Sequence, residues 1–268
     1  MTKKKTRIPL IAAAGFFVAE GIFLGYRYGI GPFQSLYDRH MRNLPGNSAR
    51  YNMDGVERME SSPLTGKRVL FLGSSVTYGA ASLQEGIPEY FAVRFGCKVT
   101  KEAVSGTTLV NDADSSYVHR LLHHIDPAED YSLIVIQLST NDATKKKPLG
   151  EIAEGYALSD FDTHTVTGAL EYTIAYSRET WDCPVAFYTG SRYDSEAYAA
   201  MVQRLFELQE KWGVGVLDLW TDDAFNAIAD SERRLYMNDR IHPTKAGYRD
   251  WWCPELERQL LRYFEAKE

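Results

Sequence analysis

The sequence predicts an α/β fold: a three-layer, doubly wound domain with a parallel five-stranded sheet, preceded by an amino-terminal membrane helix. From Lys67 onward, short apolar runs alternate with helical patterns, and this alternation is typical of a parallel sheet flanked by helices. A chain of 268 residues, of which 44% are hydrophobic and 25% charged, has the composition of a globular protein with one sizeable core.

Residues 1–26 are predicted to be a membrane anchor or signal segment. Four basic residues between positions 3 and 7 precede the apolar run Ile8–Tyr26, whose length is near the lower limit for a membrane-spanning helix. Glu20 interrupts this run at a cost of about 3 kcal/mol, which the surrounding apolar residues can offset. Because basic residues favour the cytoplasmic side, we expect a single-pass membrane protein with its body outside the cytoplasm.

The alternatives are a cleaved signal peptide, which would give a secreted protein, and a buried amphipathic helix. The small residues Ala12–Ala14 lie too early in the apolar run to be a convincing cleavage site, and this favours the uncleaved anchor. Residues 27–66 are polar and broken by three prolines, which is typical of a stalk or linker. Part of this stalk is expected to pack on the domain, with short helical pieces around Phe33–Met41 and Val56–Met59.

Residues 67–268 are predicted to form the sheet domain. The expected strands are Arg68–Leu72, Lys98–Ala103, Leu133–Leu138, Val185–Tyr188 and Val214–Leu219. The expected helices are Leu83–Phe95, Tyr117–His124, Thr163–Thr180, Ser195–Trp212, Asp222–Ala229 and Lys245–Phe264.

Composition argues against several classes of partner. A net charge of −6, without a basic face interleaved with aromatic residues, argues against binding to nucleic acid. The three cysteines, Cys97, Cys183 and Cys253, have no metal-binding spacing, and three unrelated thiols are expected. We expect neither a metal nor an organic cofactor.

Polar residues gather where the predicted strands end. The first three clusters are Gly73–Ser75, Val104–Thr108 and Ser139–Asp142, and a fourth, Asp239–Pro243, precedes the last predicted helix. The carboxyl ends of parallel strands meet at the edge where open α/β sheets bind ligands. Nucleophilic hydrolysis needs a hydroxyl, a base, a group that orients the base, and donors for the oxyanion. The four clusters contain all four parts.

These clusters resemble, in the same order, the four sequence blocks of the SGNH (GDSL-like) hydrolases. FLGSSVTYG resembles the first block, VSGTT the second, QLSTND the third and DRIHP the last. The resemblance extends from about Lys67 to the carboxyl terminus. It implies a flavodoxin-like fold and ester hydrolysis through an acyl-enzyme, without a cofactor.

The resemblance also implies a role for each site residue. Ser75 takes the position of the nucleophile, and Asp239 and His242 those of the other triad members. Gly106 and Ser75, through their backbone N–H groups, and Asn141, through its side chain, take the positions of the oxyanion hole. Asp239 and His242 are three residues apart, so one loop can present both to the nucleophile.

Two residues depart from the family pattern. Ser74 stands where the family usually has aspartate, and Ser139 stands where it usually has glycine. Neither exchange removes a chemical participant, although both make the substrate pocket less predictable. Arg192 and Tyr193, which follow the fourth predicted strand, are further candidates for contact with the substrate.

We therefore expect a serine esterase, with O-deacetylation of carbohydrate or cell-wall material as the first substrate class and lysophospholipid or other lipid esters as the second. A non-catalytic glycan-binding protein on the same fold is an alternative. So is a flavodoxin-like cofactor binder, which is disfavoured because the first predicted strand is not followed by a glycine-rich phosphate loop.

Overall fold

A computed structural model describes residues 34–267, and the chain divides after Leu44 into two compact units. In the first unit, α2 (Gln34–Asn43) forms where a short helical piece was expected. The run Ile8–Tyr26, predicted to be a membrane helix, lies outside the described residues. Within residues 34–267, no helix combines the length and the apolar character needed to cross a bilayer.

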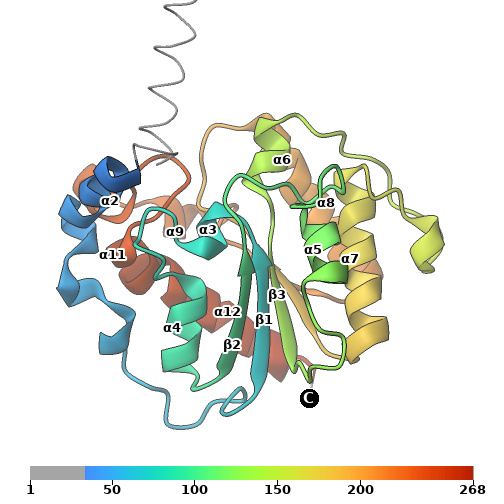
Figure 1. Ribbon diagram of the computed structural model, residues 1–268, viewed down its shortest axis with the longest axis horizontal. Helices are drawn as coiled ribbons and strands as arrows, with labels where there is room; N and C mark the ends of the chain where they lie inside the picture. The colour runs from blue at the N-terminus through green and yellow to red at the C-terminus, as the bar shows by residue number, and fades with distance from the viewer. Residues whose placement is uncertain (1–33, 268) are drawn as a thin grey trace, which may run out of the picture. The chain divides into compact units, whose positions relative to one another are not determined.

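The second unit is built on a parallel five-stranded sheet, which confirms the predicted α/β fold (Figure 1). The strand order is β2-β1-β3-β4-β5, and every neighbouring pair is parallel. The strands are β1 (Arg68–Gly73), β2 (Lys98–Ala103), β3 (Leu133–Gln137), β4 (Val185–Tyr188) and β5 (Gly215–Leu217). The chain order reverses between β1 and β3, and a sheet of this kind places its ligand site at the carboxyl ends of those two strands.

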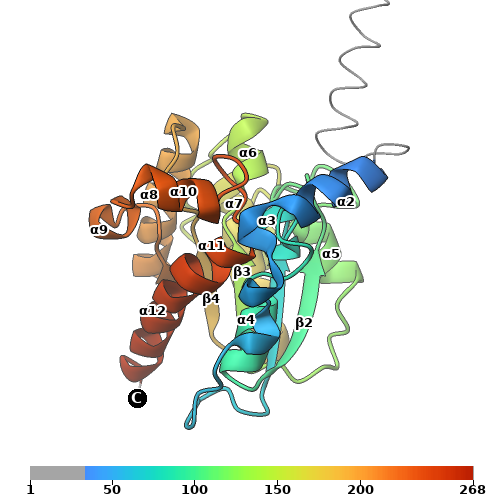
Figure 2. The same ribbon diagram turned by 90° about the vertical axis from the view of Figure 1, so that its left-hand side faces the viewer.

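Helices cover both faces of the sheet (Figures 1 and 2). On one face lie α5 (Tyr117–His123), α7 (Val166–Trp181) and α8 (Glu196–Trp212); on the other lie α4 (Ile87–Arg94) and α12 (Cys253–Glu265). Alternate strand residues serve the two cores, because successive side chains of a strand point to opposite faces. Leu70 and Leu72 belong to the first core, and Phe71 to the second.

For two of the predicted elements, the structure shows why a boundary differs from the expected one. The helix predicted from Leu83 begins at Ile87, because Leu83 and Gln84 have positive φ angles of 57° and 67°, outside the helical region. The predicted last strand, Val214–Leu219, is shortened to β5. The Asp218 carboxylate accepts hydrogen bonds from the backbone N–H groups of Trp220 and Thr221 and turns the chain.

The predicted last helix, Lys245–Phe264, is interrupted. It consists of α11 (Lys245–Gly247), a π-helical turn η6 (Tyr248–Trp252), and α12. Pro254 has no N–H to donate to the preceding turn, so the wider π turn accommodates it at the start of α12.

Three short α-helices were not predicted, and one predicted helix is shorter than expected. The structure adds α3 (Ser75–Tyr78), α6 (Thr140–Thr144) and α10 (Asp230–Tyr236), and α9 (Asp223–Asn226) is shorter than the predicted Asp222–Ala229. α3 and α6 follow β1 and β3 directly, and they carry two of the candidate site residues.

Residues 45–66 of the predicted stalk belong to the same compact unit as the sheet. They contain the 3₁₀ turns η2 (Pro45–Asn47), η3 (Ala49–Tyr51) and η4 (Met53–Gly55); the last lies just before Val56–Met59, where a helical piece was expected and does not form. The Asn47 amide donates to the Ala81 carbonyl at 2.9 Å and accepts from the Lys245 N–H at 2.9 Å. The expected boundary at Lys67 therefore falls inside this unit.

Candidate active site

Ser75 lies in a tight turn between β1 and α3. β1 ends at Gly73, and a Cβ atom there would lie 1.8 Å from Thr77 Oγ1, so only glycine lets α3 fold back this closely. α3 ends after one turn at Gly79, whose φ of 78° is in the left-handed region that favours glycine. The turn places Ser75 at the carboxyl end of β1, the neighbour of the central strand β3.

The structure brings Ser75, His242 and Asp239 together. Ser75 Oγ lies 2.7 Å from His242 Nε2, and His242 Nδ1 lies 2.9 Å from Asp239 Oδ2. An imidazole that donates from Nδ1 to the carboxylate presents an unprotonated Nε2 to the serine hydroxyl. The three side chains thus have the arrangement in which the imidazole can act as a base on the hydroxyl.

The loop that carries Asp239 and His242 is fixed by its own backbone. Met237 and Pro243 form an antiparallel bridge, and the backbone N–H groups of Ile241 and His242 donate to Asp239 Oδ1 at 2.8 and 2.9 Å. Burial raises the pKa of Asp239, but the hydrogen bond and charge of His242 and these two N–H donors outweigh burial and lower the pKa to about 2. Asp239 is therefore a carboxylate at neutral pH.

Asn141 lies between the loop after β2 and the turn after β1. Its Nδ2 donates to the Thr107 carbonyl at 2.9 Å and to Ser74 Oγ at 3.2 Å, and so links the neighbours of Gly106 and Ser75. Gly106 is exposed and has a φ of 80°, a backbone conformation that glycine adopts without strain.

Ser139, which departs from the family pattern, has a structural role in this chain. It is the N-cap of α6, and its hydroxyl accepts from the Asp142 N–H. The fully buried Asp142 carboxylate in turn accepts from the N–H groups of Leu109 and Val110 at 2.7 and 3.1 Å. Burial raises the pKa of Asp142, although these donors favour its ionised form. Asn141 and Asp142, two consecutive residues of α6, therefore both hold the loop that contains Gly106.

Arg120 supports the same edge of the sheet, and sequence reasoning missed it. Its guanidinium is fully buried and donates to the carbonyls of Gly73, at 2.8 Å, and Glu102, at 3.0 Å. It also donates to the Glu102 carboxylate at 3.0 Å. The available signal was a charged residue on the apolar face of a short helix, three positions after Tyr117.

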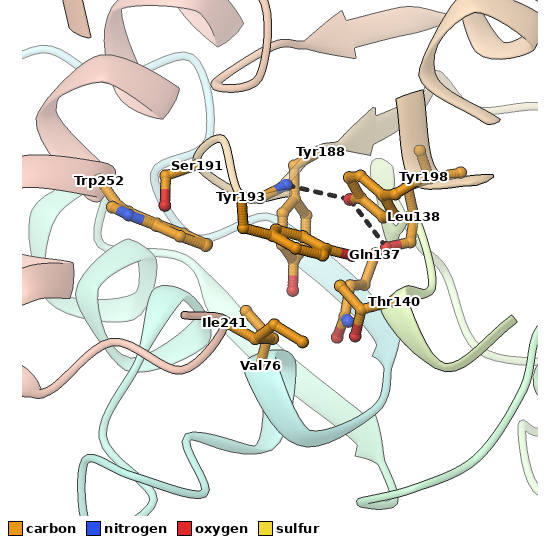
Figure 3. Close-up of a pocket in the computed structure, with 11 residues that line it drawn as sticks. Val76, Gln137, Leu138, Thr140, Tyr188, Ser191, Tyr193, Tyr198, Ile241 and Trp252 are labelled. Atoms are coloured by element: carbon orange, nitrogen blue, oxygen red, sulfur yellow. Dashed lines mark hydrogen bonds between the residues drawn. The ribbon is translucent and has the colours of Figure 1, made fainter. Parts of the chain in front are cut away.

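A small hollow is lined by residues that are sequence neighbours of the candidate residues (Figure 3). Its size is about that of one methyl group or one water molecule. Three lining residues adjoin the candidates in sequence: Val76 follows Ser75, Thr140 precedes Asn141 and Ile241 precedes His242. Aromatic side chains, including Tyr188, Tyr193 and Tyr198, also line it.

Of the two further candidates for substrate contact, only Tyr193 lines this hollow. The Tyr193 hydroxyl is buried without a hydrogen-bond partner. Arg192 instead pairs with Asp223 at 2.7 Å and donates to the Trp220 carbonyl at 3.0 Å. Arg192 therefore holds the loop between β5 and α9.

Metal-binding residues do not gather in the part of the chain that the structure describes. Across residues 34–267, no group of three or more His, Cys, Asp or Glu side chains is placed to hold a metal ion. Cys97, Cys183 and Cys253 are all buried and free. Burial raises the pKa of the Cys97 and Cys183 thiols to about 11, which keeps both protonated at neutral pH.

Comparisons with known proteins agree with this geometry. The sequence model of the GDSL-like Lipase/Acylhydrolase family matches residues 71–249. No curated protein sequence matches the chain. Among solved structures, the chain is similar to a protein from Lactobacillus plantarum (20% identity, TM-score 0.60, covering 75% of this chain and 98% of that one).

Two further solved structures share the fold. One is a candidate GDSL-like lipase from Bacteroides ovatus, with 16% identity and a TM-score of 0.53, covering 75% of this chain and 99% of that one. The other is a family two carbohydrate esterase from Clostridium thermocellum in complex with cellohexaose, with 15% identity and a TM-score of 0.50, covering 75% of this chain and 67% of that one.

Proposed function

Because the chain belongs to the GDSL-like lipase/acylhydrolase family, whose members hydrolyse esters, we propose that it is a serine esterase acting through an acyl-enzyme. The observation that carries this proposal is the hydrogen-bonded series of Ser75 Oγ, the His242 imidazole and the Asp239 carboxylate. Such a series supplies a nucleophile, its base and the group that orients the base.

In the proposed reaction, Ser75 Oγ attacks the ester carbonyl while His242 Nε2 takes the hydroxyl proton. His242 then returns this proton to the departing alcohol, and water, activated by the same imidazole, cleaves the acyl-enzyme. Asp239 remains ionised and holds the imidazole in the required tautomer.

The oxyanion would be bound by the backbone N–H groups of Ser75 and Gly106 and by the Asn141 amide. The Asn141 amide has two hydrogens, and the shorter of its two bonds runs to the Thr107 carbonyl. That bond keeps the amide in place, and the other hydrogen, which points at Ser74 Oγ, would be shared with the oxyanion.

For the substrate, we propose short acyl esters, with O-acetyl groups on carbohydrate or cell-wall material first. The size of the hollow supports this proposal, because a space for about one methyl group suits an acetyl group better than a long acyl chain. A similar fold in a carbohydrate esterase that binds cellohexaose is consistent with a glycan ester.

The test is hydrolysis of p-nitrophenyl acetate and p-nitrophenyl octanoate, together with labelling by a fluorophosphonate. We expect kcat/KM at least about tenfold higher for the acetate, since each unaccommodated methylene costs on the order of 1 kcal/mol, and we expect the label on Ser75. A preference for octanoate would move the assignment to lipid esters. Neither hydrolysis nor labelling would favour a non-catalytic glycan-binding protein.

We also propose that the run Ile8–Tyr26 is an uncleaved anchor, with residues 27–44 as the connection to the sheet domain and the site outside the cytoplasm. The length of the run and the basic residues before it support this. We expect the expressed protein to sediment with membranes at alkaline pH and mass spectrometry to find the amino terminus intact. A mature protein that begins after residue 26 would identify a cleaved signal peptide instead.

A further inference from the structure

Gln137, the last residue of β3, holds the turn that carries Ser75. Its side chain is almost fully buried, and its Oε1 accepts from the Ser74 N–H at 3.0 Å, the Thr77 N–H at 3.1 Å and Thr77 Oγ1 at 2.9 Å. The side-chain amide of Gln137 thus connects the end of β3 to the first turn of α3, the helix that follows the neighbouring strand β1.

This contact replaces the usual N-cap of α3. The first N–H groups of a helix have no partner within the helix, and an N-cap serine normally accepts from the residue three positions later. Ser74 occupies the N-cap position of α3 but makes no such bond. Gln137 Oε1 accepts from that N–H, on Thr77, instead.

Because Gln137 caps α3, the Ser74 hydroxyl is not needed as the cap and can face Asn141 instead. Ser74 Oγ is fully buried and accepts from Gln137 Nε2 at 3.1 Å and from Asn141 Nδ2 at 3.2 Å. A continuous series of hydrogen bonds therefore runs from Gln137 through the Ser74 hydroxyl to the Asn141 amide. Buried polar series of this kind rigidify the groups they join when every member is satisfied.

We propose that Gln137 is a positioning residue for ester hydrolysis: it fixes the turn of Ser75 and, through the Ser74 hydroxyl, sets the direction of the Asn141 amide. This inference rests on the proposed function. It also accounts for serine at position 74 in place of the usual aspartate. In this chain the acceptor of the Asn141 amide is a neutral hydroxyl, which a buried glutamine orients.

The experiment is a double-mutant cycle between Gln137 and Asn141 in the full-length protein, measured on p-nitrophenyl acetate. Gln137→Met keeps a similar volume and removes every bond of the amide, and we expect it to lower kcat about 10- to 100-fold. In the Asn141→Ala background the same substitution should lower kcat at least about threefold less than in the wild type, because only its effect on the turn of Ser75 remains. Equal effects in both backgrounds would mean that Gln137 does not act through the Asn141 amide and would overturn the inference.

A second variant covers the case in which Gln137→Met does not fold. Ser74→Ala breaks the link to Asn141 but leaves the Gln137 cap of α3 intact. We expect it to lower kcat about tenfold, with KM changed less than about threefold, and to lose most of this effect in the Asn141→Ala background. A Ser74→Ala enzyme with unchanged kcat would also overturn the inference.

Controls separate this inference from the proposed function. Gln209→Met removes a half-buried glutamine far from Ser75 in the sequence, which donates to the Val214 carbonyl at 3.2 Å at the end of α8. For this control, kcat should stay within about twofold of wild type. Hydrolysis and fluorophosphonate labelling of Ser75 in the wild type test the esterase assignment independently. An active wild type with additive effects in the cycle refutes only the positioning role.

Discussion

Replacing Ser75 with alanine is expected to lower kcat for ester hydrolysis by about 10⁴-fold or more. The alanine has no oxygen to form the acyl-enzyme, and the residual rate comes from the oxyanion donors and from substrate binding alone. The free energy of unfolding should change by less than about 1 kcal/mol, because the hydrogen bond lost is the one to His242 at a partly open site.

The measurement is steady-state hydrolysis of p-nitrophenyl acetate, with Ser105→Ala as the matched control. Ser105 lies beside Gly106 in the loop after β2, but its side chain is exposed. We expect the control to retain wild-type kcat within about twofold. If Ser75→Ala keeps substantial activity, the nucleophile is a different residue and the proposed mechanism is wrong.

The strands β1, β3 and β4 could be predicted from the sequence because they are buried on both faces. β3 and β4 appear as short uninterrupted apolar runs, and a run of that length between turn signals has few other interpretations. β5 was predicted too long. Its end depends on the Asp218 carboxylate, which turns the chain by accepting from the backbone N–H groups of Trp220 and Thr221.

The short helices α3 and α6 could not be predicted from periodicity. An element of four or five residues contains little more than one helical turn, so no repeat of apolar positions can develop. The start of α3 is also stabilised from outside the segment, by Gln137, which is 60 positions away from Thr77 in the chain. The sequence pattern within residues 75–78 cannot predict such a long-range contact.

For the candidate site, the sequence indicated which chemical groups are present, and the structure adds how they are supported. Ser75, Asp239 and His242 were predicted from four short blocks, and the structure places them within hydrogen-bonding distance. Arg120 belongs to no block, and Gln137, the first residue of the third block, was assigned no role from the sequence. Their contribution lies in bonds to residues 47 and 63 positions away, such as the Gly73 carbonyl and Ser74.

Replacing Asp239 with asparagine should lower kcat by about 10⁴-fold through the tautomer of His242. Asp239 Oδ1 accepts from two backbone N–H groups, so the oxygen of an asparagine is expected to take this place. Its NH₂ group would then face His242 Nδ1 and donate to it. The imidazole would carry its proton on Nε2 and could no longer accept the proton of Ser75.

The same substitution should change how stability depends on pH. The pKa of Asp239, about 2, lies below its ordinary value of 3.8, so the carboxylate stabilises the folded state above about pH 4, and this contribution is lost as the pH falls through 2. The shift corresponds to about 2 kcal/mol at most, since the side chain is 32% exposed. In urea denaturation, the difference in the free energy of unfolding between wild type and Asp239→Asn should therefore become smaller as the pH is lowered from 6 to 2. A difference that does not change with pH would contradict the low pKa, whereas an unchanged kcat would remove Asp239 from the triad.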